Sequence, residues 1–167
     1  LEMLEGKYDL ALEEVDQILA VQPRNADAYT LQGEIYWKQG ELDKAADSYA
    51  QSLEADPEMY SSYVSMAMVH ITQEKNDQAV NELKDALKGE PNATAEILLQ
   101  SLEKLPEGFK LYFHPDYRFA MAVPKGAEPS TGESATGKFV SFSYTSEGSF
   151  YNITINLFET GTSEIGD

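Results

Sequence analysis

The sequence predicts an α+β fold, in which an all-α solenoid of stacked helical hairpins is followed by a small antiparallel β segment. Three observations lead to this prediction. A phrase repeats every 34 residues, apolar residues recur at helical spacing inside each repeat, and aromatic and β-branched residues alternate with polar ones from Phe109 onward. The 167 residues suffice for two small domains, which we expect at residues 1–105 and 106–167.

The repeated phrase occurs at residues 8–23 (YDLALEEVDQILAVQP), 42–57 (LDKAADSYAQSLEADP) and 76–91 (NDQAVNELKDALKGEP). A period of this length is that of a unit with two helices and their turns, so the sequence predicts an array of such units. A shift of 34 residues aligns two sets of residues, which are Ala11, Ala45 and Ala79, and Pro23, Pro57 and Pro91.

Each unit is predicted to be a helical hairpin. Apolar residues recur at helical spacing over residues 28–37 and again over 42–55, and a turn that contains Gly40 separates the two stretches. The small residues Gly33 and Ala45 allow the two helices to approach closely. Pro57 ends the second helix, because proline disfavours helical geometry in the residue before it.

These positions resemble the pattern of the tetratricopeptide repeat (TPR) family, which implies a right-handed superhelix of hairpins. The next unit departs from the pattern at His70 and at Glu74, which stands where Gly40 stood before. The resemblance implies a partial repeat at 1–25, whose first helix is reduced to residues 1–5, repeats at 26–59 and 60–93, and a capping helix at 92–105 that begins at Asn92. The matching residues are Tyr29, Gln32, Gly33, Tyr36, Ala45, Tyr49 and Pro57, followed by Tyr63, Met66, Ala67, Ala79, Leu83 and Pro91.

The carboxyl-terminal part is predicted to form strands over residues 109–113, 117–123, 138–145 and 149–159. Val140 and Phe142 alternate with Ser141 and Ser143, so one face of that strand is apolar. The short connection at Ser146–Gly148 predicts an antiparallel hairpin. Residues 124–137 are rich in Gly, Ser and Pro, and we expect a mobile loop there.

Residues 109–126 resemble the opening of PsbP-like domains, on the stretch FHPDYRFAMAVPKG. This resemblance implies that residues 106–167 are an incomplete β-rich domain, and it favours a location in the bacterial cell envelope or periplasm. The alternative is a small antiparallel sheet that packs on the last helix.

The composition excludes several classes of function. There are 29 acidic and 12 basic residues, and the formal charge of −17 disfavours binding to nucleic acids or to anionic lipids. The absence of cysteine excludes disulfides and thiolate metal sites. The longest apolar run, Phe119–Val123, is much shorter than the roughly 18 residues of a membrane-spanning helix, so no membrane insertion is expected.

No combination of residues in the sequence indicates an active site. His70 and His114 are the only histidines. His70 falls at a packing position between helices, and His114 is expected in an exposed loop before Pro115. We therefore expect no catalytic residue, no cofactor, no metal site and no enzymatic activity.

The TPR resemblance implies that the first helices of successive hairpins line a concave groove. The groove is expected to expose an apolar patch with Trp37 as its main contact, the alternative being that several of its members are core residues. Thr30, Glu34 and Ser65 stand where TPR domains that grip chaperone tails carry Lys and Asn, so a chaperone cofactor is not expected. The groove positions are Leu31, Glu34, Trp37, Lys38, Val64, Ser65, Met68, Ile71 and Thr72.

The leading hypothesis is a scaffold that binds a peptide or protein segment in this groove. A second hypothesis is a structural module of a larger cell-envelope protein that forms a homo-oligomer through its amino-terminal end, where Leu1, Met3, Leu4 and one face of Tyr8–Val21 are expected to lack a neighbour. A third, an enzyme with its site in the β segment, is the least favoured.

Overall fold

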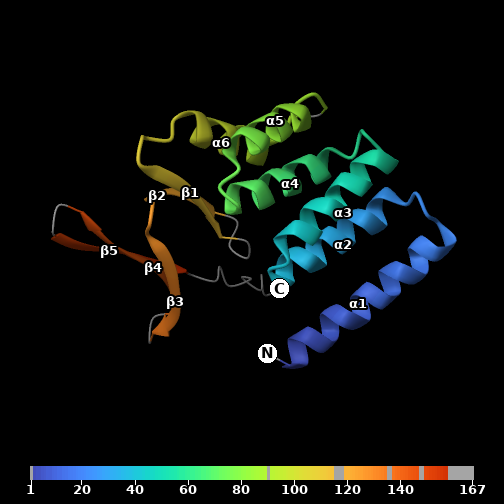
Figure 1. The fold of residues 1–167 in the computed structure, drawn as a ribbon, viewed down its shortest axis with the longest axis horizontal. Coiled ribbons are helices and arrows are strands. Elements are labelled where there is room, and N and C mark those ends of the chain that lie inside the picture. Colours follow the sequence, from blue (N-terminus) through green and yellow to red (C-terminus); the bar gives the residue numbers. More distant parts are fainter. Residues whose placement is uncertain (1, 90, 115–118, 135–136, 147–148, 158–167) are drawn as a thin grey trace, which may run out of the picture. The chain divides into compact units, whose positions relative to one another are not determined.

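The computed structural model describes residues 2–89, 91–114, 119–134, 137–146 and 149–157. Within these ranges the chain forms six α-helices and five β-strands (Figure 1). The helices are α1 (Glu2–Val21), α2 (Ala26–Gln39), α3 (Leu42–Ala55), α4 (Tyr60–Thr72), α5 (Asn76–Ala86) and α6 (Ala93–Glu103). The strands are β1 (Phe109–His114), β2 (Phe119–Pro124), β3 (Glu128–Ser134), β4 (Gly137–Ser146) and β5 (Ser149–Leu157).

The contacts divide the chain into two compact units. One unit comprises Leu1–Pro106 and Leu111–Ala122, and the other comprises Glu107–Lys110 and Val123–Asp167. The sequence-based boundary after residue 105 differs from this division, since most of β1 and β2 belongs to the helical unit.

Helices α1 to α6 pack against one another in chain order, as the prediction of stacked hairpins requires (Figure 1). The turn between α2 and α3 depends on Gly40, whose φ of 80° lies in the left-handed region that glycine tolerates. In the next unit Glu74 adopts the same conformation, with a φ of 60°, although it carries a side chain. The repeat therefore imposes its turn geometry even where the favoured residue is missing.

Helix α1 is longer than predicted. The first helix of the partial repeat was predicted to be reduced to residues 1–5, but α1 runs continuously from Glu2 through Gly6 to Val21. One glycine inside a helix costs only about 1 kcal/mol relative to alanine, so it does not by itself end the helix. The helix is fixed by Val15, which is buried in a cluster with Ala28 and Ile35 of α2.

Close packing between α2 and α3 occurs at Gly33. A Cβ at this position would lie 2.7 Å from Cε1 of Tyr49, which is fully buried. Ala45, Ala67 and Ala79, the other small residues of the pattern, are also fully buried. The prediction that small residues allow the helices to approach closely is confirmed.

Three hydroxyl groups join α2, α3 and α4 in what we call the hydroxyl triangle. Thr30 Oγ1 lies 2.9 Å from Ser52 Oγ and 2.7 Å from Ser62 Oγ, and the two serine oxygens are 2.9 Å apart. Ser52 and Ser62 are fully buried. A buried hydroxyl is costly unless it is hydrogen-bonded, so the three groups satisfy one another and hold the hairpins in register.

The predicted capping helix corresponds to α6. The Asn92 side chain accepts a hydrogen bond from the backbone N–H of Ala95 at 3.0 Å, which caps the helix as expected. Strand β1 follows it and pairs with β2. Leu111 and Phe113 of β1 are buried in the same core cluster as Leu98 and Leu102 of α6, which agrees with the alternative that a small sheet packs on the last helix.

The second unit contains the sheet β3-β4-β5, in which both strand pairs are antiparallel. The pairing of β4 with β5 confirms the predicted hairpin, although residues 147–148 of its turn lie outside the described residues. Val140 and Phe142 are fully buried and Ser143 is exposed, so the alternation is also confirmed.

The prediction of a mobile loop at residues 124–137 is wrong for Glu128–Ser134, which form β3. This segment pairs along its whole length with β4, and Gly132 lies opposite Phe139. A Cβ at Gly132 would lie 2.5 Å from Cζ of the Phe139 ring, so the glycine provides space for a neighbour rather than a flexible loop.

Candidate functional site

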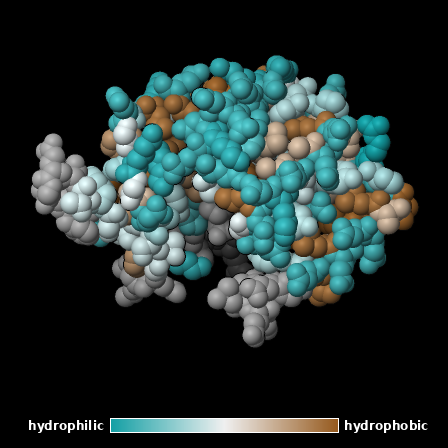
Figure 2. Space-filling view, viewed as in Figure 1, coloured by the Kyte–Doolittle hydropathy of each residue, from teal (hydrophilic) through white to brown (hydrophobic). Residues whose placement is uncertain are grey.

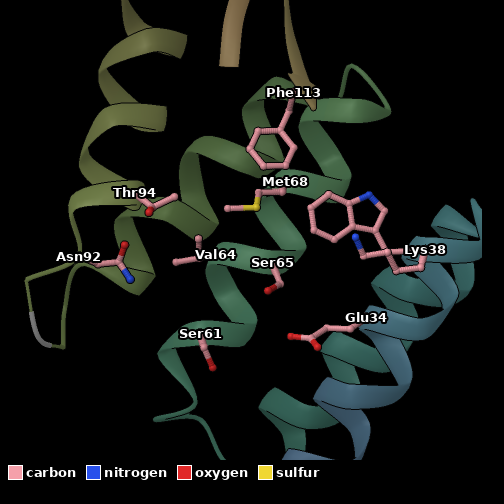
Figure 3. Close-up of a pocket in the computed structure, with 10 residues that line it drawn as sticks. Glu34, Lys38, Ser61, Val64, Ser65, Met68, Asn92, Thr94 and Phe113 are labelled. Carbon is pink, nitrogen blue, oxygen red and sulfur yellow. The ribbon is translucent and has the colours of Figure 1, made fainter. Parts of the chain in front are cut away.

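The helical unit contains a cavity of about 510 Å³. Its walls come from α2, α4, the start of α6 and strand β1, and Figure 3 shows α4 in the middle with residues of α2 on one side and of α6 on the other. The lining residues are Glu34, Trp37, Lys38, Ser61, Val64, Ser65, Met68, Asn92, Thr94 and Phe113.

One end of the cavity is apolar. The rings of Trp37 and Phe113 stack with their centroids 5.7 Å apart and an interplanar angle of 24°. Val64, Met68 and Phe113 are all buried, with exposed fractions of 6%, 8% and 5%. Figure 3 shows Phe113 reaching from its strand over Met68. The apolar end is therefore already filled by side chains of the protein.

The rest of the cavity is polar and accessible. Glu34, Lys38, Ser61 and Thr94 are exposed, and Ser65 is half-buried between them. Figure 3 shows the Glu34 carboxylate extending from α2 toward the serines of α4. This part of the lining offers hydroxyl groups together with one carboxylate and one ammonium group.

A buried hydroxyl lies close to this polar lining. The Tyr49 hydroxyl has no hydrogen-bond partner within the described part of the chain. Burial raises the pKa of Tyr49 well above its usual range, the Glu34 carboxylate raises it further, and the nearby Ser65 hydroxyl opposes the shift. Tyr49 therefore stays neutral at physiological pH, as a phenol beneath the polar side of the cavity.

Six of the nine residues predicted for the groove line this cavity, and three do not. Ile71 is buried in the core at 1% exposure, whereas Leu31 and Thr72 are exposed and lie outside the lining. The six that are brought together are Glu34, Trp37, Lys38, Val64, Ser65 and Met68.

The predicted exposed apolar patch is wrong for Val64, Met68 and Ile71. All three are buried in one cluster with Leu111 and Phe113 of β1, which covers them. The alternative that several groove positions are core residues holds for these three.

Four lining residues are not among the predicted groove positions. Ser61 lies one helical turn before Ser65, so helical periodicity could have found it. Asn92 and Thr94 open α6, and a capping helix that continues the array could have been expected to extend its concave face. Phe113 lies beyond the repeats, and no periodic signal connects it to them.

Both histidines are buried and contact neighbouring side chains. His70 is buried as predicted, and its Nδ1 donates a hydrogen bond of 2.7 Å to Oε1 of Glu82 on α5. The prediction of an exposed His114 is wrong, because His114 ends β1 and is buried, with its ring stacked on Phe119 at a centroid distance of 5.5 Å. Neither histidine lines the cavity.

Nothing among the described residues resembles a metal site, since no group of three or more His, Asp or Glu side chains is placed to hold an ion. Within the same residues, no helix combines the length and the apolar character needed to cross a membrane. The cavity lining has the character of a binding site, with an aromatic end and several hydrogen-bonding side chains.

Comparison with known proteins gives a match for the sequence of the repeats and a match for the arrangement of the helices. Residues 5–60 match the family model described as Tetratricopeptide repeat. Among solved structures, the crystal structure of the Sgt2 TPR domain from Aspergillus fumigatus is similar, with a TM-score of 0.54 and 16% sequence identity over 61% of this chain and 70% of that chain. At this identity the similarity shows the fold alone. No curated protein matches the chain.

Proposed function

We propose that the chain is an interaction scaffold that binds a peptide or protein segment in the cavity between α2, α4, α6 and β1, because residues 5–60 match the tetratricopeptide repeat model and the helices have the fold of such a domain. The observation that carries this proposal is the composition of the cavity lining. Ser61, Ser65 and Thr94 present hydroxyl groups in the same cavity that the side chain of Trp37 lines.

A bound peptide would form hydrogen bonds with the polar part of the lining. The backbone of an extended segment has free N–H and C=O groups, and the hydroxyl groups of Ser61, Ser65 and Thr94 can donate to and accept from them. The cavity volume of about 510 Å³ lies within the usual range for ligand sites, roughly 300–1,000 Å³. Tetratricopeptide repeat proteins are generally non-catalytic, and the proposed role is binding only.

The partner is proposed to be a protein or peptide rather than a nucleic acid. The formal charge of −17 repels phosphate groups, and the cavity lining has only Lys38 as a cation. No metal or cofactor is required for the proposed role.

The proposal is tested by selecting a phage library of random peptides on the full chain and measuring the affinities of enriched peptides by calorimetry. Ser65→Tyr places a large side chain in the cavity and should reduce affinity at least about tenfold, which corresponds to about 1.4 kcal/mol. Thr72→Tyr is the matched control, because Thr72 is exposed on the same helix seven residues further on but does not line the cavity. Equal affinities for the two variants would place the binding site elsewhere.

A second role, self-association, is favoured by an apolar face of α1. Leu10, Ile18 and Val21 are 62%, 41% and 80% exposed. Their spacing of eight and three residues puts them on one side of the helix. Figure 2 shows hydrophobic surface, in brown, over the region that α1 occupies in Figure 1. Exposed apolar faces of this kind mark interaction sites, and a second copy of the chain can supply the same face.

A further inference from the structure

Phe113 differs from the rest of the cavity lining, because it comes from a strand that follows the helices rather than from the helices themselves. Its ring stacks on Trp37 and belongs to the core cluster that contains Val64 and Met68. These are the apolar groups that an incoming side chain would otherwise contact. Phe113 therefore occupies the position where a partner would insert an aromatic or large aliphatic side chain.

The packing of β1 holds Phe113 in this position. Leu111, two residues earlier on the same face of the strand, is 5% exposed in the same core cluster. At the end of the strand the His114 ring stacks on Phe119 of β2. Phe113 thus lies between two anchored residues, and a competing side chain would have to displace a strand as well as a ring.

The accessible part of the lining is polar and carries no excess of either charge. The exposed lining residues are Glu34, Lys38, Ser61 and Thr94, so one carboxylate and one ammonium group accompany the hydroxyl groups. A segment with small polar side chains can hydrogen-bond to this surface without burying an unpaired charge.

We propose that Phe113 is a specificity-determining residue of the cavity. It fills the apolar end from within the molecule, so the cavity accepts segments with small, uncharged polar side chains and rejects those that insert an aromatic or large aliphatic side chain. This inference rests on the proposed function, in which the cavity is the peptide-binding site.

The test compares the wild-type chain with Phe113→Ala, using N-acetyl-phenylalanine amide as the probe. Trp37 is the only tryptophan of the chain and stacks on Phe113, so its fluorescence reports binding beside it. The probe should bind Phe113→Ala at least tenfold more tightly than the wild type. Leu87→Ala is the matched control, since Leu87 packs against the same core cluster but neither belongs to β1 nor lines the cavity, and it should behave as the wild type.

The inference is overturned if the wild type and Phe113→Ala bind the probe equally, or if Leu87→Ala gains as much affinity as Phe113→Ala. Should Phe113→Ala lose helical circular dichroism, Phe113→Leu replaces it. That variant keeps an apolar side chain, and it should show a smaller gain of the same sign.

Peptide selection separates this inference from the proposed function. Peptides enriched on the wild type should be poor in Phe, Trp and Leu, and those enriched on Phe113→Ala should be rich in them. If enriched peptides depend on Ser65 but already carry aromatic anchors on the wild type, only the specificity assigned to Phe113 is refuted. If no peptide depends on Ser65, the proposed function fails, and with it the role of Phe113 in choosing a partner.

Discussion

Replacing Gly33 by alanine tests how tightly the first complete hairpin is packed. The added Cβ would lie 2.7 Å from Cε1 of Tyr49 and 2.9 Å from both Cδ1 and Cζ. Ordinary van der Waals contacts begin at 3.4 Å, so the nearest contact is about 0.7 Å too short. Because Tyr49 is fully buried, its ring cannot rotate into open space, and α2 and α3 must move apart.

The expected loss of stability is the balance of two opposing effects. Overpacking of a core costs about 1–3 kcal/mol, and three ring atoms within 3.0 Å place this clash toward the upper end. Alanine recovers about 1 kcal/mol, since glycine is the poorer helix former. We therefore expect Gly33→Ala to lower the free energy of unfolding by about 1–2 kcal/mol.

The repeat itself provides a compensating substitution. Ala67 and Leu83 stand 34 residues beyond Gly33 and Tyr49, and both are fully buried. The Gly33→Ala, Tyr49→Leu double variant copies this second pair. Its loss of stability should be smaller than the sum of the two single losses, by at least about 1 kcal/mol, because the clash is absent once the ring is removed.

Urea unfolding followed by far-ultraviolet circular dichroism measures all four proteins, and it reports mainly on the helices. The reasoning is refuted if Gly33→Ala is as stable as the wild type. It is also refuted if the double variant loses the full sum of the single losses, because Gly33 and Tyr49 would then act independently.

Three further predictions concern a turn, the hydroxyl triangle and α1. Glu74→Gly should stabilise the helices by roughly 1 kcal/mol in urea unfolding, because φ is 60° there, and Gly40→Ala should destabilise them by a similar amount; stabilisation by both would contradict this. Ser62→Ala should cost about 1–2 kcal/mol by leaving buried hydroxyl groups short of a partner, and a neutral result would mean that the triangle is dispensable. The wild type should self-associate in sedimentation velocity, and Leu10→Lys with Val21→Lys should give monomers; a monomeric wild type would count against the apolar face of α1 as an interface.

The helical part of the fold was predictable because its determinants recur within one period. Gly33 and Ala45 identify the close approach of two helices, and Gly40 identifies the turn between them. Each of these signals acts within a single hairpin. The prediction of a first helix reduced to residues 1–5 was wrong, because residues 2–5 continue into α1, and a single glycine costs too little to end a helix.

The β part was less predictable because its strands are defined by their partners. The composition of Glu128–Ser134 suggests a loop, yet the segment is held by β4 along its whole length. Gly132 is required there by the ring of Phe139, a contact between two strands that no local pattern indicates. Strands with clear alternation, such as the one that contains Val140 and Phe142, were found.

The candidate site includes residues that the repeat pattern predicts and residues of a strand that it does not predict. The repeat positions of α2 and α4 were predicted to line one concave groove, and six of the nine predicted residues line the cavity. Whether such a surface is open depends on the segment that comes after the array in the chain. Here Leu111 and Phe113 cover part of this surface, so the apolar residues that were predicted to contact a partner belong to the core.

Whether a lining residue is accessible or belongs to the core decides whether its substitution can report on binding. Trp37 was expected to be the main contact of the groove, but its ring stacks on Phe113 and packs against the same core as Met68. Trp37→Ala would therefore remove support from β1 as well as a contact surface, and a loss of affinity would not separate these effects. Ser65 lies on the accessible side of the cavity and is no member of that core, so Ser65→Tyr perturbs the partner's space while leaving the contact between β1 and the helices in place.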